Sequence, residues 1–267
     1  MRLEGSETYQ IALGLELRGT YAHVFSYYMG AFARPTKPNQ PHPAPWQALK
    51  GGGIAFDVET EAFLCQDARL GPMSRLGSLW LLAALIRLLS AAAIHMPSIS
   101  TNAYARIPEG GDDDTIWAAE IPAPAGRWEV NIDANFVRGL QSCLGNAAQL
   151  TSEPAFYRAF QTFDGAAWLP TPATQMIAIW TAIETVMRPG RQQITKRLAS
   201  ALGDYLGADR SARDRICNQA IQLYHSRGNA THDGQQTTQK ALRESYMLAR
   251  DMFIQIIATG QMPPVSP

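Results

Sequence analysis

The sequence predicts an α+β N-terminal domain followed by an all-α helical bundle. Two observations predict this fold class. In the first half, apolar and polar residues alternate in short runs, which is the period of half-buried strands. In the second half, apolar residues recur every three or four positions over long segments, which is the period of amphipathic helices. The change falls near residues 126–133, so we expect an α+β domain over residues 1–128 and a helical domain over residues 133–260.

Length and composition limit the class of protein. The 267 residues are enough for two domains, and an apolar share of 46% allows a sizeable core. A charged share of only 17% argues against a disordered chain. The net charge is zero, so overall charge does not attract polyanions, and any contact with nucleic acid has to come from a local patch.

Several features favour a cytoplasmic protein. The three cysteines, Cys65, Cys143 and Cys217, are far apart and include no CxxC pair, which argues against a disulfide framework and a zinc site. The N-terminus lacks a basic region followed by an apolar stretch, so we expect no signal peptide. The apolar run from Leu76 to Met96 is interrupted by Arg87, which favours a buried helix over a membrane span.

The N-terminal domain begins with a strand-like pattern. Alternation within residues 1–32 predicts a strand. Its alternating apolar residues are Tyr9, Ile11, Leu13, Leu15 and Leu17. Residues 34–53 contain five prolines and end in three glycines, so we expect a loop there. A second strand is expected over Ile54 to Leu64.

The rest of this domain is expected to hold one helix and three short strands. The helix covers Leu76 to Met96, and Pro97 stops it. The three strands are expected over Ile99 to Ile107, Thr115 to Ile121 and Trp128 to Ile132. Three adjacent acids, Asp112 to Asp114, lie between the first two of these strands, and a solvated turn is favoured over a cation site.

Six helices are expected in the C-terminal domain. Asp133 is a candidate N-cap for the first of them. The third helix has a continuous apolar stripe made of Met176, Trp180, Ile183 and Met187. The fourth has a similar stripe made of Ile194, Leu198, Leu202 and Tyr205. The expected ranges are 134–150, 154–163, 174–187, 192–206, 212–232 and 237–258.

Arg227 interrupts an apolar stripe on the fifth of these helices. The stripe consists of Ile216, Ala220, Leu223 and Ala230. A guanidinium on it is costly unless paired or facing a cavity, so the plainest interpretation is an arginine held by a carboxylate or by carbonyls. His232 follows five residues later, about 140° around an ideal helix. Either the helix ends near Gly234 and lets the histidine turn back, or the two side chains converge only across a dimer interface.

The segment from Arg227 to His232 fits the R-x4–6-H motif of HEPN domains. Leu223-Tyr224 before it and Asp233-Gly234 after it are similar to the pattern of the Apea-like branch of that family. Upstream, Ile179 to Met187 resembles the "WtALEtl" helix of the branch, and Ile194 to Ala199 resembles its connecting helix, in matching order and spacing. The C-terminal half therefore resembles an Apea-like HEPN domain, which implies an all-α HEPN-like helical bundle.

This resemblance implies a metal-independent endoribonuclease without cofactors that works as a homodimer in anti-phage defence or as a toxin. In RNA cleavage of this kind, the 2′-hydroxyl attacks the neighbouring phosphate. Arg227 would hold that phosphate bidentately, and His232, a residue type that titrates near neutral pH, would move the proton. The N-terminal domain would be a sensor or regulator that responds to a ligand or a protein.

The sequence departs from the family pattern directly after the motif arginine. Catalytic members usually carry a polar residue there, whereas this chain has Gly228. Asn229 comes next and is the candidate substitute, so we include it with the catalytic residues.

Two residues are candidates for supporting roles. Glu184 lies in the segment that matches the acidic helix of the family, and it is either a salt-bridge partner that orients Arg227 or an exposed helix acid. Tyr224, one turn before the arginine, either lines the cleft or packs in the core. A locally basic region suits an RNA backbone or an ordinary solvated surface. Its candidate RNA contacts are Arg191, Lys196 and Arg197.

A second hypothesis has the same helical fold but no catalytic activity. In it the protein is a non-catalytic dimerisation module that binds RNA or protein, and Arg227 and His232 have structural roles. Loss of cleavage without loss of stability in variants of this pair separates the two hypotheses.

Overall fold

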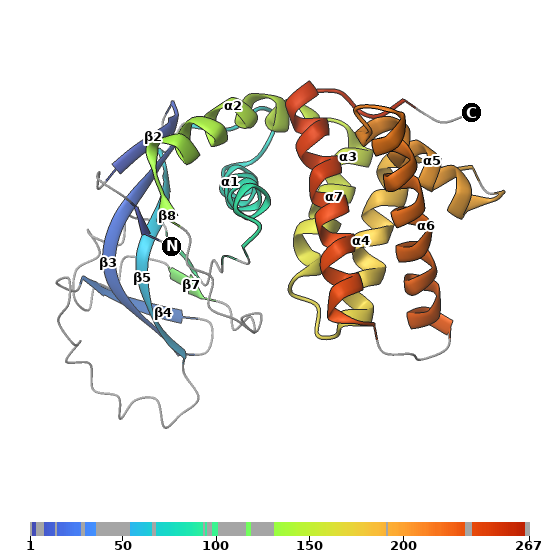
Figure 1. The fold of residues 1–267 in the computed structure, drawn as a ribbon. Helices are drawn as coiled ribbons and strands as arrows, with labels where there is room; N and C mark the ends of the chain where they lie inside the picture. Colours follow the sequence, from blue (N-terminus) through green and yellow to red (C-terminus); the bar gives the residue numbers. More distant parts are fainter. Residues whose placement is uncertain are drawn as a thin grey trace. The chain divides into compact units, whose positions relative to one another are not determined.

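The computed structural model describes most of the helical part of the chain and parts of the N-terminal region (Figure 1). The described residues are 2–3, 8–13, 15–27, 30–35, 54–65, 68–92, 94, 98–100, 116–118, 131–190, 192–232 and 237–264. Over these residues the protein is mostly helical, with seven helices, and it has a small antiparallel sheet near the N-terminus.

The chain divides into two compact units. The second unit consists of Cys143–Pro267 together with Leu70–Ser74 and Ala84–Ala91, and the first unit takes the remainder. Helices α1 (Arg75–Ser90) and α2 (Ala134–Leu150) are therefore each shared between the units. The division falls within α2, whereas the sequence pattern changes a few residues earlier.

The main sheet is built around one long strand, β3 (Leu15–Tyr27). Its first residues pair with β2 (Thr8–Ala12), and its last residues pair with β4 (Gly30–Pro35). Strand β5 (Ile54–Leu64) runs along β3 as well, and all of these pairings are antiparallel. The strand predicted over Ile54 to Leu64 is confirmed.

Two small ladders complete the described strands. Strand β1 (Arg2–Leu3) pairs in parallel with β8 (Asn131–Ile132), and β6 (Ser98–Ser100) pairs antiparallel with β7 (Ile116–Ala118). Parts of all three strands predicted between Ile99 and Ile132 lie in β6, β7 and β8, and the rest of each, like the acids Asp112 to Asp114, lies outside the described residues.

The prediction of one strand through the first alternating run is wrong. The chain reverses at Leu13, whose side chain is 92% exposed, so the run is a hairpin of β2 and β3. Ile11, Leu15 and Leu17 are buried, so most of the alternation does mark an apolar face. The expected loop also begins later than predicted, because β4 continues to Pro35. A proline is tolerated there because it is the last residue of the strand, where its missing N–H does not remove a hydrogen bond from the middle of the sheet.

Helix α1 begins where the sequence predicted and ends earlier. The side chain of Arg250, on helix α7 (Gln239–Thr259), donates hydrogen bonds to the carbonyls of Leu88 (2.6 Å) and Leu89 (2.8 Å), and Ala91 adopts a left-handed φ of 53°. The predicted later end at a proline is therefore wrong, because a distant side chain satisfies the last carbonyls. Over the described residues, no helix has the length and apolarity needed to cross a membrane.

Six helices follow the sheet region, and their starts have local causes. Asp133 accepts a hydrogen bond from the Phe136 amide at 2.7 Å, which confirms it as the N-cap of α2. Thr171 forms a reciprocal capping box with Thr174 at the start of α4, where Pro172 is tolerated because the first turn needs no amide donor. Besides α2 the helices are α3 (Pro154–Ala166), α4 (Pro172–Met187), α5 (Ile194–Leu206), α6 (Arg210–His232) and α7 (Gln239–Thr259).

The core of the second unit lies around α4, which packs against α3, α6 and α7 (Figure 1). The predicted stripe on α4 is confirmed, because each of its four residues is at most 1% exposed. Phe156, Phe160 and Phe253 pack ring against ring beside it, with centroids 5.3 to 6.1 Å apart. The stripe predicted on α5 is only partly right, since Leu198 and Leu202 are buried but Ile194 is exposed.

Close packing of α5 against α6 depends on Gly203. A Cβ atom at this position would lie 2.9 Å from the Arg213 carbonyl oxygen and would also overlap the Cys217 Sγ. We expect Gly203→Ala to lower the free energy of unfolding by about 1–3 kcal/mol, measured by urea denaturation. Gly145→Ala is the matched control, because Gly145 lies in α2 with open space around it and should gain a few tenths to about 1 kcal/mol. Equal effects of the two substitutions would contradict this account.

Candidate functional site

The packing of α6 on α4 brings three of the predicted residues together. The Tyr224 hydroxyl donates a hydrogen bond to Oε1 of Glu184 at 2.9 Å. The same oxygen lies 3.7 Å from Nη2 of Arg227, within ion-pair distance. The Arg227 guanidinium carbon also lies 5.3 Å from the centre of the Tyr224 ring. One carboxylate oxygen thus receives a hydroxyl and a guanidinium from neighbouring turns of α6.

A buried aromatic residue packs against this cluster from the core. Trp180 lies one turn before Glu184 on α4, and its ring meets the Tyr224 ring edge to face with centroids 5.1 Å apart. Its indole nitrogen donates to the Ser245 hydroxyl of α7 at 3.1 Å. Trp180 and Ser245 are both fully buried, so the cluster rests on a packed part of the core.

The charged side chains of the cluster remain partly exposed to solvent. The side chain of Arg227 is 24% exposed and that of Glu184 is 29% exposed. Burial first, and then the Glu184 carboxylate, raise the pKa of Tyr224 above its ordinary value, although the Arg227 charge acts in the opposite direction. The tyrosine hydroxyl therefore stays protonated at neutral pH and can continue to donate.

The histidine of the motif lies on the same continuous helix as the arginine. Helix α6 extends through His232, so positions 227 and 232 are about 140° apart around its axis. The helix ends at His232, close to Gly234 as one of the two alternatives expected, and not between the two residues. The side chains of Asn229 and His232 lie outside the described part of the structure, as does Arg191.

Gly228 is not required by packing against the described residues. A Cβ atom at this position would meet nothing within 4 Å, and a glycine inside a helix is unfavourable relative to alanine. The glycine therefore leaves a flat place on the surface of α6, beside the motif arginine.

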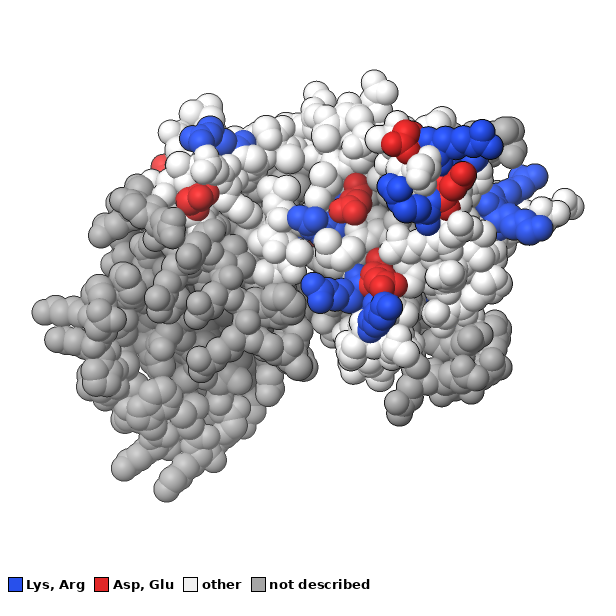
Figure 2. All heavy atoms as spheres, viewed as in Figure 1, with Lys and Arg blue, Asp and Glu red and all other residues white. Residues whose placement is uncertain are grey.

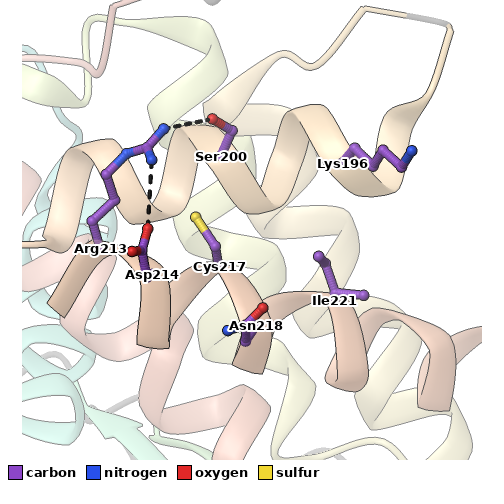
Figure 3. Close-up of a pocket in the computed structure, with 7 residues that line it drawn as sticks. All are labelled: Lys196, Ser200, Arg213, Asp214, Cys217, Asn218 and Ile221. Atoms are coloured by element: carbon purple, nitrogen blue, oxygen red, sulfur yellow. Dashed lines mark hydrogen bonds and ion pairs between the residues drawn. The ribbon is translucent and has the colours of Figure 1, made fainter. Parts of the chain in front are cut away.

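A polar groove between α5 and α6 was not foreseen from the sequence. Its volume is about 370 Å³ (Figure 3). Its lining includes Lys196 and Ser200 from α5 and Arg213, Asp214, Asn218 and Ile221 from α6. The helical spacing of these residues on each helix was visible in the sequence, but the pairing of the two helices was not.

Basic and acidic side chains alternate over this part of the second unit (Figure 2). Lys196 and Arg197 are exposed on α5, as an RNA contact would require. Arg213 contacts Asp204 and lies 3.7 Å from Asp214, and its hydrogen bond lowers the pKa of the Asp204 carboxyl. The basic region is therefore partly neutralised at the end of α5 that carries Asp204, and it is most positive at the other end.

Loss of the tyrosine hydroxyl tests the hydrogen bond to Glu184. We expect Tyr224→Phe to lower the free energy of unfolding by about 1 kcal/mol, because the ring contacts stay and one hydrogen bond to a charged acceptor is lost. Urea denaturation measures this change. Glu184→Gln keeps an acceptor for the hydroxyl and should cost less. An unchanged midpoint for Tyr224→Phe would mean that the hydrogen bond contributes nothing to stability.

Within the described part of the chain, no three His, Cys, Asp or Glu side chains gather closely enough to hold a metal ion. In comparisons with family models, curated proteins and solved structures, no match to this chain was found.

Proposed function

We propose that the helical unit is an Apea-like HEPN domain and that the protein is a metal-independent endoribonuclease, acting as a homodimer in anti-phage defence or as a toxin. The observation that carries the proposal is the cluster of Tyr224, Glu184 and Arg227. It holds a guanidinium at the surface, on the helix that also carries the motif histidine. Two of the three segments that resemble the family, those on α4 and α6, contribute residues to this cluster.

Each step of the proposed reaction uses a residue of the motif. The RNA 2′-hydroxyl attacks the adjacent phosphorus, and the 5′-oxygen of the next nucleotide leaves, which gives a 2′,3′-cyclic phosphate and a 5′-hydroxyl. His232 transfers a proton at the attacking or leaving oxygen. Arg227 donates to two phosphate oxygens and stabilises the charge that builds up on them. Asn229 supplies a further hydrogen bond to the phosphate.

Glu184 and Tyr224 act as positioning residues in this proposal. A partly exposed arginine side chain has several rotamers, and an ion pair with Glu184 restricts them. The Tyr224 hydroxyl occupies the same carboxylate oxygen and keeps the carboxylate turned toward the guanidinium. The pair is partly solvated, so a phosphate can compete for the guanidinium at a modest cost.

The geometry of α6 favours a site composed from two protomers. Positions 227 and 232 are about 140° apart around the axis of one helix, which is unfavourable for contacting one phosphate from a single chain. Two copies of α6 related by a two-fold axis bring the arginine of one copy toward the histidine of the other. Homodimerisation thus belongs to the proposed mechanism.

A non-catalytic module that binds RNA or protein is the second candidate. Gly228 favours it, because the position after the arginine has no polar side chain. The ion pair with Glu184 also favours it, since it gives Arg227 a structural role.

An RNA cleavage assay in EDTA separates the two candidates. Wild type, Arg227→Ala and His232→Ala are incubated with total RNA, and circular dichroism checks that each is folded. We expect cleavage by wild type and a loss of about 100-fold or more in each variant. Arg243→Ala is the matched control, because Arg243 is an exposed arginine on a different helix, α7. Absence of cleavage by folded wild type would leave the binding module as the function.

A further inference from the structure

The groove between α5 and α6 has a positive charge at one end and a paired cation and anion at the other. Lys196 lies at one end, and Arg213 and Asp214 lie at the other (Figure 3). Among the described residues, no carboxylate pairs with Lys196. At the far end two carboxylates, Asp204 and Asp214, face the single guanidinium of Arg213. The groove therefore offers an ammonium group at one end, and at the other end the charges of Arg213 and its carboxylate partners largely cancel.

The middle of the groove offers an amide and an apolar surface. Asn218 presents both donor and acceptor atoms, and Ile221 presents a hydrocarbon face between it and Lys196 (Figure 3). The volume of about 370 Å³ lies in the range of small-molecule sites. A ligand that fits carries an anionic group, a flat ring and hydrogen-bonding groups at the ring edge, which describes a nucleotide.

The groove and position 232 lie on one face of α6. Asp214 and His232 are eighteen residues apart, which is five full helical turns, and Ile221 is within about 20° of the same direction. Gly228 falls on this face too, where the absent side chain permits close approach of a ligand backbone. From Ile221 to position 232 the distance along the axis is about 16 Å, which a few nucleotides span.

We propose that the groove between α5 and α6 binds one nucleotide of single-stranded RNA, with its phosphate at Lys196 and its base edge at Asn218 and Asp214. The strand then continues over Gly228 toward His232. This inference rests on the proposed ribonuclease function. It adds a subsite that recognises one nucleotide at a fixed distance from the cleaved bond.

Binding of a labelled oligonucleotide tests the subsite. A fluorescent single-stranded 2′-O-methyl RNA of mixed sequence is used, because it lacks the attacking hydroxyl and stays intact. Fluorescence polarisation gives the Kd of wild type, Lys196→Ala and Asn218→Ala between 50 and 300 mM salt. Both side chains are exposed, so the substitutions should leave the fold unchanged, which circular dichroism checks. Lys240→Ala and Gln219→Ala are matched controls on exposed positions outside the groove.

The two variants are expected to differ in their salt dependence. Asn218→Ala should raise Kd by about 5–10-fold without changing the salt slope, because it loses contacts to a base. Lys196→Ala should raise Kd and reduce the slope of log Kd against log salt by about 0.7, because it loses one phosphate contact. The controls should bind like wild type.

Three outcomes would overturn the subsite. The first is wild-type affinity in both variants, and the second is no binding of RNA by wild type. The third is displacement of the oligonucleotide by nucleoside monophosphates at equal concentration, which would make the groove a site for free nucleotides. The cleavage assay keeps the two proposals apart. If wild type cleaves RNA but both variants bind the oligonucleotide as wild type does, only the subsite proposal is wrong. If Asn218→Ala weakens binding but wild type does not cleave RNA, only the ribonuclease proposal is wrong.

Discussion

A 1:1 mixture of Arg227→Ala and His232→Ala protomers is expected to recover about a quarter of the wild-type ribonuclease activity, although each variant alone is inactive. In a two-fold dimer whose sites combine Arg227 of one protomer with His232 of the other, each mixed dimer has one intact site and one doubly defective site. Random assortment makes half of the dimers mixed. Half of the dimers with half of their sites intact gives one quarter.

The experiment requires that protomers exchange. Co-expression with two different affinity tags isolates the mixed dimer directly, and its activity should then approach half that of wild type. The control pairs each single variant with the Arg227→Ala/His232→Ala double variant, which restores no site. If isolated mixed dimers remain inactive while wild type cleaves RNA, the two residues act within one chain and the composite site is wrong.

Asp164→Ala is expected to lower the free energy of unfolding by about 3–5 kcal/mol. Asp164 of α3 accepts two hydrogen bonds from Arg87 of α1, at 2.7 Å from Nε and 2.6 Å from Nη2. Both side chains are less than 10% exposed. Removal of the carboxylate deprives a buried guanidinium of this counter-charge.

Two further variants define the cause of that loss. Arg87→Met/Asp164→Leu removes both charges and should restore most of the stability, because the cost of Asp164→Ala comes from the uncompensated charge. Glu244→Ala breaks an exposed ion pair with Lys240 (3.9 Å) and should change the stability by less than about 0.5 kcal/mol. Chemical denaturation measures all three, and a loss below 1 kcal/mol for Asp164→Ala would show that the buried pair is not a main source of stability.

Local patterns predicted the parts of the fold that depend on neighbouring residues. The N-cap at Asp133, strand β5 and the buried stripe of α4 each follow from residues within a few positions of one another. The turn at Leu13 was missed because a large apolar residue stands where a turn residue is usual. The end of α1 was missed because Arg250, more than 150 residues away, determines it.

In the candidate site, too, contacts between neighbouring residues were predictable and contacts between distant residues were not. The apolar stripe of α6 indicated that Arg227 needs a partner, but periodicity alone did not identify it. Glu184 became a candidate only through a motif resemblance, because it lies on another helix. Arg87 was recognised as a charge in an apolar run, yet its partner Asp164 lies 77 residues away and had no local sign. The α5–α6 groove was missed because polar residues on separate helices form no pattern along the chain.

The contact of Arg250 with the last carbonyls of α1 has a consequence for the order of events during synthesis. The ribosome makes Leu88 162 residues before Arg250, which at roughly 5–20 residues per second is a delay on the order of ten seconds. During this interval the last carbonyls of α1 are hydrogen-bonded to water. The Asp164 carboxylate that pairs with Arg87 becomes available only after α3 has emerged from the ribosome. The last turns of an early helix are thus completed by the final helix of the chain, so this part of the protein cannot finish folding in the order in which it is made.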